Sequence, residues 1–215
     1  MPEHRSTCMA VFGMMTEEMD KGDAGECELL GRWNNPGSAS GSFVCTAPNV
    51  TAIGSWLQNW ITMANCTVRP CVDDNQAREI ILKGEKPSFQ ASYYHKVGDE
   101  APEGYSLYTI DAKIDFAHRV QCFEAFAGMT EEQDTADPGD VILMGRYHDL
   151  GTGTGFCICA AKSEVDLYKW AWNWASMCDC KIQPVMSDKE ARAMITSKPN
   201  NALDVLKARA EMGMV

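Results

Sequence analysis

The stretch Trp56-x-x-Asn59-Trp60 recurs as Trp170-x-x-Asn173-Trp174, and it is part of a much longer repeat. Residues 8–82 align with residues 122–196 at a constant offset of 114 positions and without a gap. About a third of the paired positions are identical. A repeat of this length is one folding unit made twice. We therefore predict two copies with the same fold, related by pseudo-two-fold symmetry, and we look for specialisation where the copies differ.

Glycines, tryptophans, an arginine and a proline recur in both copies and form a shared fold motif. Its members are Gly31, Arg32, Trp33, Gly37, Gly41, Trp56, Trp60 and Pro70 in the first copy, and Gly145, Arg146, Tyr147, Gly151, Gly155, Trp170, Trp174 and Pro184 in the second. Glycines at both ends of the turn between two strands supply the backbone freedom that a tight turn needs. The glycine-rich turn of the second copy lies between strands and does not precede a helix, so we interpret it as a hairpin turn and not as a phosphate loop.

The repeat divides the chain into a first α+β repeat at 8–82, connecting strands at 83–121, a second α+β repeat at 122–196 and a tail at 197–215 with a short helix. Each copy is predicted to fold as strand, polar loop, strand, turn, strand, helix, strand and short helix. In the first copy the expected strands are residues 9–15, 27–34, 42–47 and 66–72, the polar loop is 16–25, and the helices are 50–64 and 74–82. The connecting strands are expected at 89–97 and from residue 105 onward, running into the first strand of the second copy. These elements predict antiparallel sheets with helices on one face.

The composition excludes several classes of function. The formal net charge is −11, which argues against binding to nucleic acid or to anionic membrane surfaces. No window of 18 apolar residues exists, so no membrane insertion is expected. The first seven residues lack the apolar run of a signal peptide, and we expect any targeting peptide to be absent from this chain.

Ten cysteines raise the question of disulfides or metal. Phe43 and Cys45 alternate with Ser42 and Thr46 on a predicted strand, and Cys157 and Cys159 are their counterparts in the second copy. Cys66 and its counterpart Cys180 alternate with polar residues in the same way. We interpret these cysteines as small buried apolar side chains. The Cys157/Cys159 and Cys178/Cys180 pairs lack the two-residue spacing of zinc knuckles. We therefore predict no metal site and no cofactor, with a reducing compartment. A redox or metal sensor built on these pairs is the alternative.

Arg146 and His148 form a candidate polar site. They are two positions apart on a predicted strand, and they share its face opposite the core. Such a pair could bind an anion or act as acid and base. The alternative is a solvated or interfacial pair, which Asn34 at the matching position of the first copy favours. We predict no catalytic residue.

The helix of the second copy carries the most informative difference. Tyr168 and Trp172 are four residues apart and lie opposite the apolar stripe, where the first copy has Gly54 and Gln58. Two large aromatic side chains on a face expected to be solvated indicate a contact surface. The tail helix adds candidate assembly contacts at Leu203 and Leu206. The alternative is that this tail covers Tyr168 and Trp172 within the same chain.

The segments Gly145–Gly155, Trp170–Trp174 and Lys181–Val185 resemble a family of small uncharacterised α+β domains common in cyanobacteria and other bacteria. The resemblance implies ferredoxin-like domains of the dimeric α+β barrel type. A tandem duplication of such a domain, rich in cysteine and methionine, is similar to the diatom pyrenoid shell proteins. That second resemblance implies a plastid protein at the periphery of the pyrenoid, which tiles around the Rubisco matrix and supports CO2 fixation.

Two hypotheses follow. The first is a structural protein whose main partner is itself, in a homo-oligomeric sheet or tube, with Rubisco or other pyrenoid proteins as the further partners that the resemblance implies. A protomer with two similar surfaces can make repeated contacts that do not close. The second is a small-molecule enzyme or binding protein that uses Arg146 and His148 in a cleft.

Overall fold

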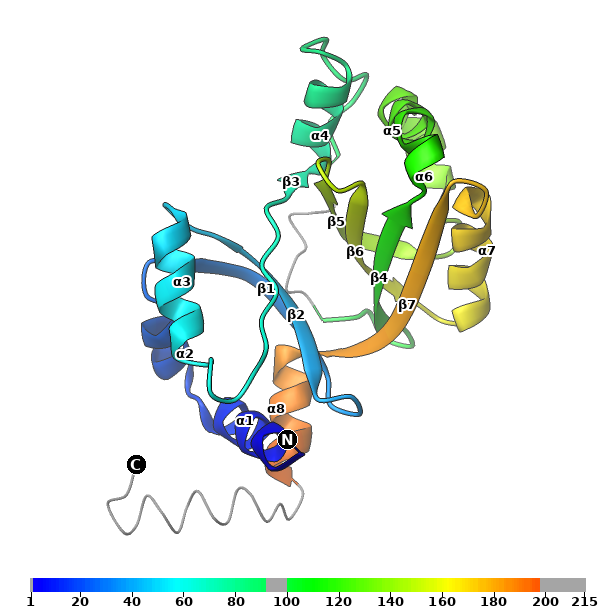
Figure 1. Cartoon of the computed structure of the whole chain (residues 1–215). Helices are drawn as coiled ribbons and strands as arrows, with labels where there is room; N and C mark the ends of the chain where they lie inside the picture. Colours follow the sequence, from blue (N-terminus) through cyan, green and yellow to red (C-terminus); the bar gives the residue numbers. More distant parts are fainter. Residues whose placement is uncertain (1, 92–99, 198–215) are drawn as a thin grey trace, which may run out of the picture. The chain divides into compact units, whose positions relative to one another are not determined.

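The computed structural model describes residues 2–91 and 100–197, and the chain divides into two compact units (Figure 1). Unit 1 comprises Met1–Val68 and Met186–Val215, and unit 2 comprises Arg69–Val185. The fold is α+β and is made of two tandem ferredoxin-like repeats, as the sequence predicts.

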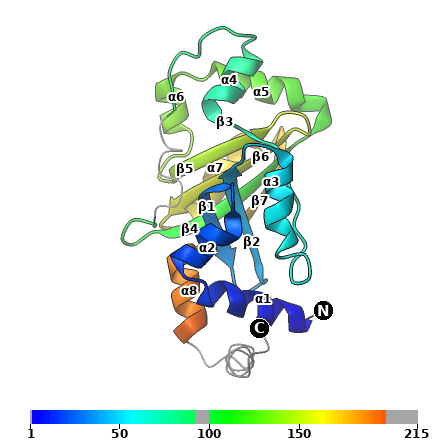
Figure 2. The same ribbon diagram turned by 90° about the vertical axis from the view of Figure 1, so that its left-hand side faces the viewer.

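Unit 2 contains the complete ferredoxin-like pattern. Its elements are β4 (Ser106–Ile114), the 3-10 helix η2 (Phe116–His118), α5 (Arg119–Gly128), α6 (Glu131–Ala136), β5 (Ile142–Asp149), β6 (Thr154–Ala161), α7 (Glu164–Trp174) and β7 (Cys178–Ser187). Two elements of the first repeat join them, β3 (Val72–Asp73) and α4 (Asp74–Ile81). The strands are antiparallel in the order β7-β4-β6-β5-β3. Figure 2 shows α4, α5 and α6 gathered at one end of this unit.

Unit 1 repeats most of this pattern. Its elements are α1 (Pro2–Met14), α2 (Glu17–Ala24), β1 (Glu28–Asn35), β2 (Ser40–Thr46) and α3 (Val50–Gln58), with the last two residues of β7 and all of α8 (Asp188–Ser197) from the second repeat. β1 pairs antiparallel with β2 and, through Trp33 and Asn34, with the end of β7. α1 lies against α8 (Figure 1).

The two repeats thus exchange their C-terminal segments. β3 and α4 follow the first repeat in the chain but pack in unit 2, where Val72 pairs with His148 and Asp73 with Tyr147. The end of β7 and α8 follow the second repeat but pack in unit 1, where Met186 pairs with Asn34 and Ser187 with Trp33. All four pairs are related by the offset of 114 positions. Each compact unit therefore contains residues from both repeats.

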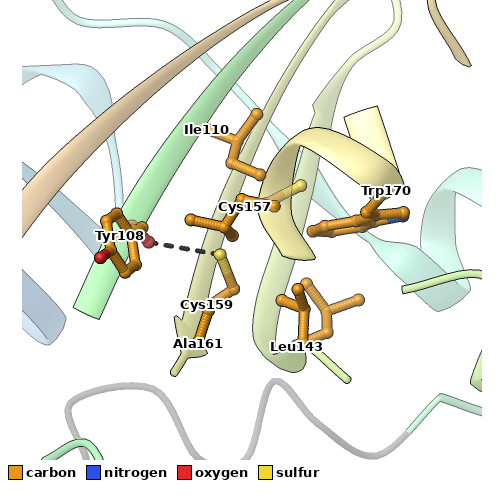
Figure 3. Close-up of a cluster of buried hydrophobic side chains, with 9 residues drawn as sticks. Tyr108, Ile110, Leu143, Cys157, Cys159, Ala161 and Trp170 are labelled. Atoms are coloured by element: carbon orange, nitrogen blue, oxygen red, sulfur yellow. Dashed lines mark hydrogen bonds between the residues drawn. The ribbon is translucent and has the colours of Figure 1, made fainter. Parts of the chain in front are cut away.

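The main core lies between α7 and the sheet of unit 2 (Figure 3). Leu167 and Trp170 of α7 pack on Tyr108, Cys157 and Cys159 of β4 and β6. Cys159 donates a weak hydrogen bond to the carbonyl oxygen of Tyr108 over 3.6 Å. The prediction that Cys157 and Cys159 are buried apolar side chains is confirmed, since both are buried.

Several predicted elements are wrong. Residues 9–15 lie almost entirely in α1, and their counterparts lie in α5, so a helix stands where a strand was predicted. The long strand predicted from residue 105 ends at Ile114, and residues 119–128 are helical. The predicted polar loop contains the helix α2, which Thr16 caps by accepting a hydrogen bond from the Met19 amide.

The strand predicted at 66–72 begins only at Val72, and residues 64–71 have no regular structure. Cys66 is consequently exposed, although a buried position was predicted. The helix predicted at 50–64 ends at Gln58, which leaves Ile61 63% exposed. The start of the strand predicted at 89–97 has no strand structure, and its remainder lies outside the described residues, as does the tail helix.

Irregular pairing explains a wrong assignment of faces. The pairing of β5 with β6 shifts between Leu143 and Gly145, as that of β1 with β2 does between Leu29 and Gly31. A shift of one residue moves the following side chains to the other face. Arg146 therefore lies opposite Cys157, on the helix-covered face and not on the opposite one.

No helix in the described part of the chain is both long enough and apolar enough to cross a membrane.

Candidate functional site

A cluster of charged side chains is buried at the helix end of unit 2. Asp74 and Arg78 lie on α4, Asp134 on α6 and Arg146 on β5, and we call these four residues the unit 2 cluster. Arg146 binds Asp74 with both arms, Nε to Oδ1 at 2.8 Å and Nη2 to Oδ2 at 2.6 Å. Its Nη2 also donates to Asp134 over 2.7 Å, and Arg78 Nη2 donates to the same Asp134 oxygen over 2.8 Å. Two cations and two anions thus neutralise one another.

Local structure brings Asp74 to this place. β3 pairs with β5, and α4 starts immediately afterwards with Asp73 as its N-cap. Asp73 and Gln76 form a reciprocal capping box, in which the Gln76 amide donates to Asp73 over 2.9 Å. This arrangement fixes the first turn of α4. The first residue of that turn is Asp74, whose side chain is fully buried.

His148 extends the unit 2 cluster. Its Nε2 lies 2.7 Å from Asp74 Oδ1, and its ring lies 4.5 Å from the ring of Phe126. Burial lowers the pKa of His148, although the hydrogen bond with Asp74 opposes this effect. Burial alone would raise the pKa of Asp74, but the charge of Arg146 and the hydrogen bonds from Arg146 and His148 hold it well below its usual range. The imidazole is therefore neutral and the carboxylate ionised near neutral pH.

Unit 1 contains the same arrangement 114 positions away, formed by Asp20, Arg32, Asp188 and Arg192, and we call these residues the unit 1 cluster. Arg32 binds Asp188 through Nε and Nη2, both at 2.7 Å, and it binds Asp20 through Nη1 at 3.0 Å. Arg192 reaches Asp20 over 3.2 Å. Asn34 takes the place of His148 and donates to Asp188 over 3.2 Å. The unit 1 cluster is less enclosed, since the Asp188 side chain is 33% exposed.

An aromatic ring lies beside the arginines of each cluster. In unit 2 the guanidinium carbons of Arg78 and Arg146 lie 4.3 and 4.8 Å from the ring centre of Phe126. In unit 1 Arg192 and Arg32 lie 4.3 and 4.9 Å from the equivalent Phe12. A cation over an aromatic face is attracted by the ring quadrupole. Both arginines of each cluster are thus held on a ring as well as by carboxylates.

The tryptophan motif also has a duplicated explanation. Trp170 and Trp174 donate their indole N–H groups to the same oxygen of Asp137, over 2.6 and 3.0 Å. Trp56 and Trp60 do the same with Asp23, over 2.7 and 2.8 Å. The asparagine between each pair of tryptophans binds the same aspartate. The motif Trp-x-x-Asn-Trp therefore fixes α7 to Asp137, which lies just after α6. It fixes α3 to Asp23, which lies near the end of α2.

The other members of the predicted fold motif shape the strands and turns. Gly31 and Gly145 lie at the irregular pairings, while Gly37 and Gly151 lie in the turns that follow β1 and β5. A side chain at Gly41 would come within 3.0 Å of the Trp33 carbonyl oxygen. The remaining motif residues are Trp33 and Tyr147, which are buried, Gly155 at the start of β6, Pro184 on β7, and Pro70 in the irregular segment before β3.

The helix α7 presents an exposed apolar surface. Tyr168 and Trp172 are 65% and 79% exposed, and Val165 beside them is 59% exposed. We call these three residues the α7 surface. The sequence prediction that Tyr168 and Trp172 lie opposite the core stripe is confirmed, because Leu167 and Trp170 are buried. Leu203 and Leu206, the other candidate assembly contacts, lie outside the described residues.

One groove in unit 2, of about 510 Å³, lies away from Arg146 and His148. It is lined by residues of and next to α5, α6 and α7, including Gln133, Asp137 and Trp174. Neither Arg146 nor His148 lines it. The sequence prediction of a polar pair at these positions was incomplete, because it missed the carboxylates that both side chains bind. The cluster residues that the prediction missed are identical in the two copies, and this identity is the signal that could have found them. The identical pairs are Asp20 and Asp134, Asp74 and Asp188, and Arg78 and Arg192.

The cysteine pair on β7 has its sulfur atoms 3.8 Å apart, at Cys178 and Cys180. Burial raises the pKa of Cys157 to about 12. Among the residues that the structure describes, no group of three or more histidine, cysteine, aspartate or glutamate side chains is arranged to hold a metal ion.

Comparison with known proteins gives one family. Its model, described as a domain of unknown function (DUF3303), matches residues 3–85 and again residues 106–198. No curated protein and no solved structure matches the chain significantly. The two matches cover most of the sequence, and each includes one arginine and one aspartate of both Arg–Asp clusters. The chain therefore belongs to the DUF3303 family and contains two copies of its domain.

Proposed function

We propose that this protein is a structural protein that assembles with copies of itself into a sheet or shell. The observation that carries this proposal is the α7 surface. An indole that is 79% exposed beside a phenol that is 65% exposed is unfavourable in water unless a partner covers it. Tryptophan and tyrosine are also the residues most enriched among those that dominate binding energy.

The difference between the repeats supports a contact surface rather than a fold requirement. α3, together with the turn that follows it, makes the same indole contacts to its aspartate as α7 does. It nevertheless carries Gly54 and Gln58 where α7 carries Tyr168 and Trp172. The fold of the helix therefore does not need the two aromatic residues. One chain thus offers two similar units with different outer faces, which favours heterologous contacts that repeat without closing.

The resemblance to the diatom pyrenoid shell proteins indicates where such an assembly would act. We propose a plastid location at the periphery of the pyrenoid, with the assembly enclosing the Rubisco matrix and supporting CO2 fixation. The net charge of −11 keeps the protein soluble until specific contacts overcome the repulsion between copies.

The alternative is an enzyme or small-molecule binding protein that uses Arg146 and His148. The contacts of these residues support it less well. Arg146 donates to two carboxylates, and His148 lies on one of them, so both side chains already serve the unit 2 cluster. Mass spectrometry of the purified protein under native conditions tests this alternative, because a retained small molecule that His148→Asn loses would support it.

The assembly proposal is tested by Trp172→Glu with the matched control Gln58→Glu. Both positions are exposed, occupy the same place in the repeat and gain the same charge. We expect wild type and Gln58→Glu to form sheets or tubes in negative-stain electron microscopy, while Trp172→Glu stays small. Equal assembly of the two variants would contradict a role for the α7 surface.

A further inference from the structure

Two thiols lie side by side at the start of β7, the strand that follows α7 (Figure 1). The sulfur atoms of Cys178 and Cys180 are 3.8 Å apart, and one thiol donates a hydrogen bond to the other sulfur. Both cysteines are free, and both are half-buried. Because residues two apart on a strand share a face of the sheet, the two side chains are neighbours.

The backbone at this position is compatible with a disulfide. Both residues lie in regular antiparallel pairing with β4, where Cys178 is opposite Ile114 and Cys180 is opposite Ala112. Residues two apart on a strand have Cα atoms about 6.6 Å apart, since a strand rises about 3.3 Å per residue. Disulfides span Cα separations of roughly 4.4–6.8 Å. A bond between these two sulfurs therefore lies at the long end of the range, which makes it strained and easily reduced.

The contact between the sulfurs also favours ionisation of one of them. The hydrogen bond with Cys178 lowers the pKa of Cys180, although burial opposes this effect. The same hydrogen bond, together with burial, raises the pKa of Cys178. Because the thiolate is the form that attacks a disulfide, Cys180 is the nucleophile of the pair and Cys178 is the thiol that reacts second.

The first repeat carries only half of this arrangement. Cys66 is the counterpart of Cys180, but Ala64 stands at the position of Cys178. Burial raises the pKa of Cys66, whereas the pKa of Cys180 is lowered. The second thiol is thus a feature of the second repeat that the shared fold does not require.

We propose that Cys178 and Cys180 form a dithiol site that exchanges with low-molecular-weight disulfides, such as oxidised glutathione, and closes a reversible disulfide within β7. In the first step the Cys180 thiolate attacks one sulfur of the small disulfide. This step forms a mixed disulfide and releases one small thiolate. The site is independent of the proposed assembly, since it uses neither the α7 surface nor a second copy of the chain.

The second step resolves the mixed disulfide. Cys178 gives its proton to the released thiolate and attacks the sulfur of Cys180, which expels the second small thiolate. That thiolate takes up the proton that Cys180 lost at the start. In sum the protein loses two hydrogen atoms and two electrons, and the small disulfide is reduced to two thiols.

A third cysteine offers the competing product. Cys122 on α5 is buried, and burial together with the nearby Cys180 raises the pKa of Cys122 to about 11. A thiol with so high a pKa is seldom ionised near neutral pH and reacts slowly. Cys178, which is in contact with Cys180, should therefore resolve the mixed disulfide before Cys122 does.

Peptide mass spectrometry of the full chain tests the site, because trypsin separates it from the other cysteines. Cleavage after Lys169 and Lys181 gives a peptide of residues 170–181, whose cysteines are Cys178 and Cys180 alone. The reduced protein is incubated with oxidised glutathione, alkylated and digested. We expect this peptide to lose both alkylatable thiols and to have the mass of the reduced peptide less two hydrogen atoms. An excess of reduced glutathione should restore both thiols.

Two variants assign the roles of the thiols. Cys178→Ala, which copies Ala64 of the first repeat, should retain glutathione on Cys180 as a stable mixed disulfide, because the resolving thiol is gone. Cys122→Ala should form the internal disulfide to the same extent as wild type. The inference is overturned if the wild-type peptide keeps two free thiols, retains glutathione, or becomes joined to the peptide that contains Cys122. It is equally overturned if Cys178→Ala takes up no glutathione at Cys180.

Discussion

Arg146 and Asp74 are 72 positions apart in the sequence and form a two-armed ion pair, with Nε–Oδ1 and Nη2–Oδ2 distances of 2.8 and 2.6 Å. Asp74 belongs to the first repeat and Arg146 to the second. The pair therefore joins the exchanged helix α4 to the sheet of unit 2. Arg32 and Asp188 form the reciprocal pair in unit 1. The arginine that the repeats share, Arg146 in one copy and Arg32 in the other, thus binds the helix that the other repeat contributes to its unit.

Removal of one buried carboxylate should destabilise unit 2 strongly. Asp74→Ala leaves Arg146 buried beside Arg78 with Asp134 as the remaining carboxylate of the cluster, and the loss of one partner of a buried pair costs about 3–5 kcal/mol. The free energy of unfolding, measured with urea, checks this value. Asp188→Ala is the matched control and should cost less, because Asp188 is 33% exposed and Asp74 is fully buried. Equal losses of unfolding free energy in the two variants would show that the deeper burial of Asp74 does not matter for stability.

The exchange of segments should make the repeats depend on one another. A fragment of residues 1–85 lacks α8, and with it Asp188 and Arg192 of the unit 1 cluster. It should be unfolded or aggregated by circular dichroism, and addition of a fragment of residues 86–215 should restore cooperative unfolding. A first fragment that folds alone with full stability would show that the exchanged helix is not required.

The tryptophan motif predicts a contrast between two neighbouring residues of α7. Trp170→Phe removes an indole N–H that donates to Asp137 over 2.6 Å, and a lost hydrogen bond to a charged group costs about 1.5–3 kcal/mol. Trp172→Phe, at an exposed position, should change the free energy of unfolding by less than about 0.5 kcal/mol. Urea denaturation of both variants checks the contrast, which fails if the two losses are similar.

Stability should fall with decreasing pH, partly through His148. Burial lowers the pKa of His148, so the unfolded chain binds a proton at a higher pH than the folded chain does. Stability is therefore lost as pH falls below about 6.5, the usual pKa of histidine. Asp74, whose pKa is also lowered, adds a loss at more acidic pH. His148→Asn, which copies the first repeat, should flatten the slope between about pH 6.5 and 5.

His118→Asn is the control for this pH dependence. His118 is exposed and contacts Asp115 on its own turn, so the same substitution at this position separates the effect of the buried imidazole from the effect of replacing a histidine at the surface. A His148→Asn slope that matches wild type would show that the buried imidazole does not control acid stability.

The repeat and the apolar faces of the helices could be predicted from the sequence, because both depend on the local spacing of residues. Leu167 and Trp170 repeat at helical intervals, and the structure buries both. The helix α1 could not be identified in the same way, since Met9, Val11 and Met15 alternate as in a strand. Tertiary packing of Ala10 and Phe12 against α8 favours the helix instead.

The Arg–Asp clusters were missed for a different reason. Asp74 reaches Arg146 only through the exchange of segments, and Arg146 reaches the helix-covered face only through the irregular pairing at Leu143 and Gly145. Neither effect leaves a periodic signal. The identity of Asp74 with Asp188, and of Asp134 with Asp20, was visible in the repeat, but aspartates at helix starts are usually helix caps.

Negative-stain electron microscopy of the purified wild-type chain over a range of protein concentrations tests the proposed function most directly. Self-assembly through the α7 surface predicts extended sheets or tubes that Trp172→Glu abolishes and Gln58→Glu retains. A compact monomer or closed dimer at every concentration, with a small molecule retained in the native mass spectrum, would contradict it.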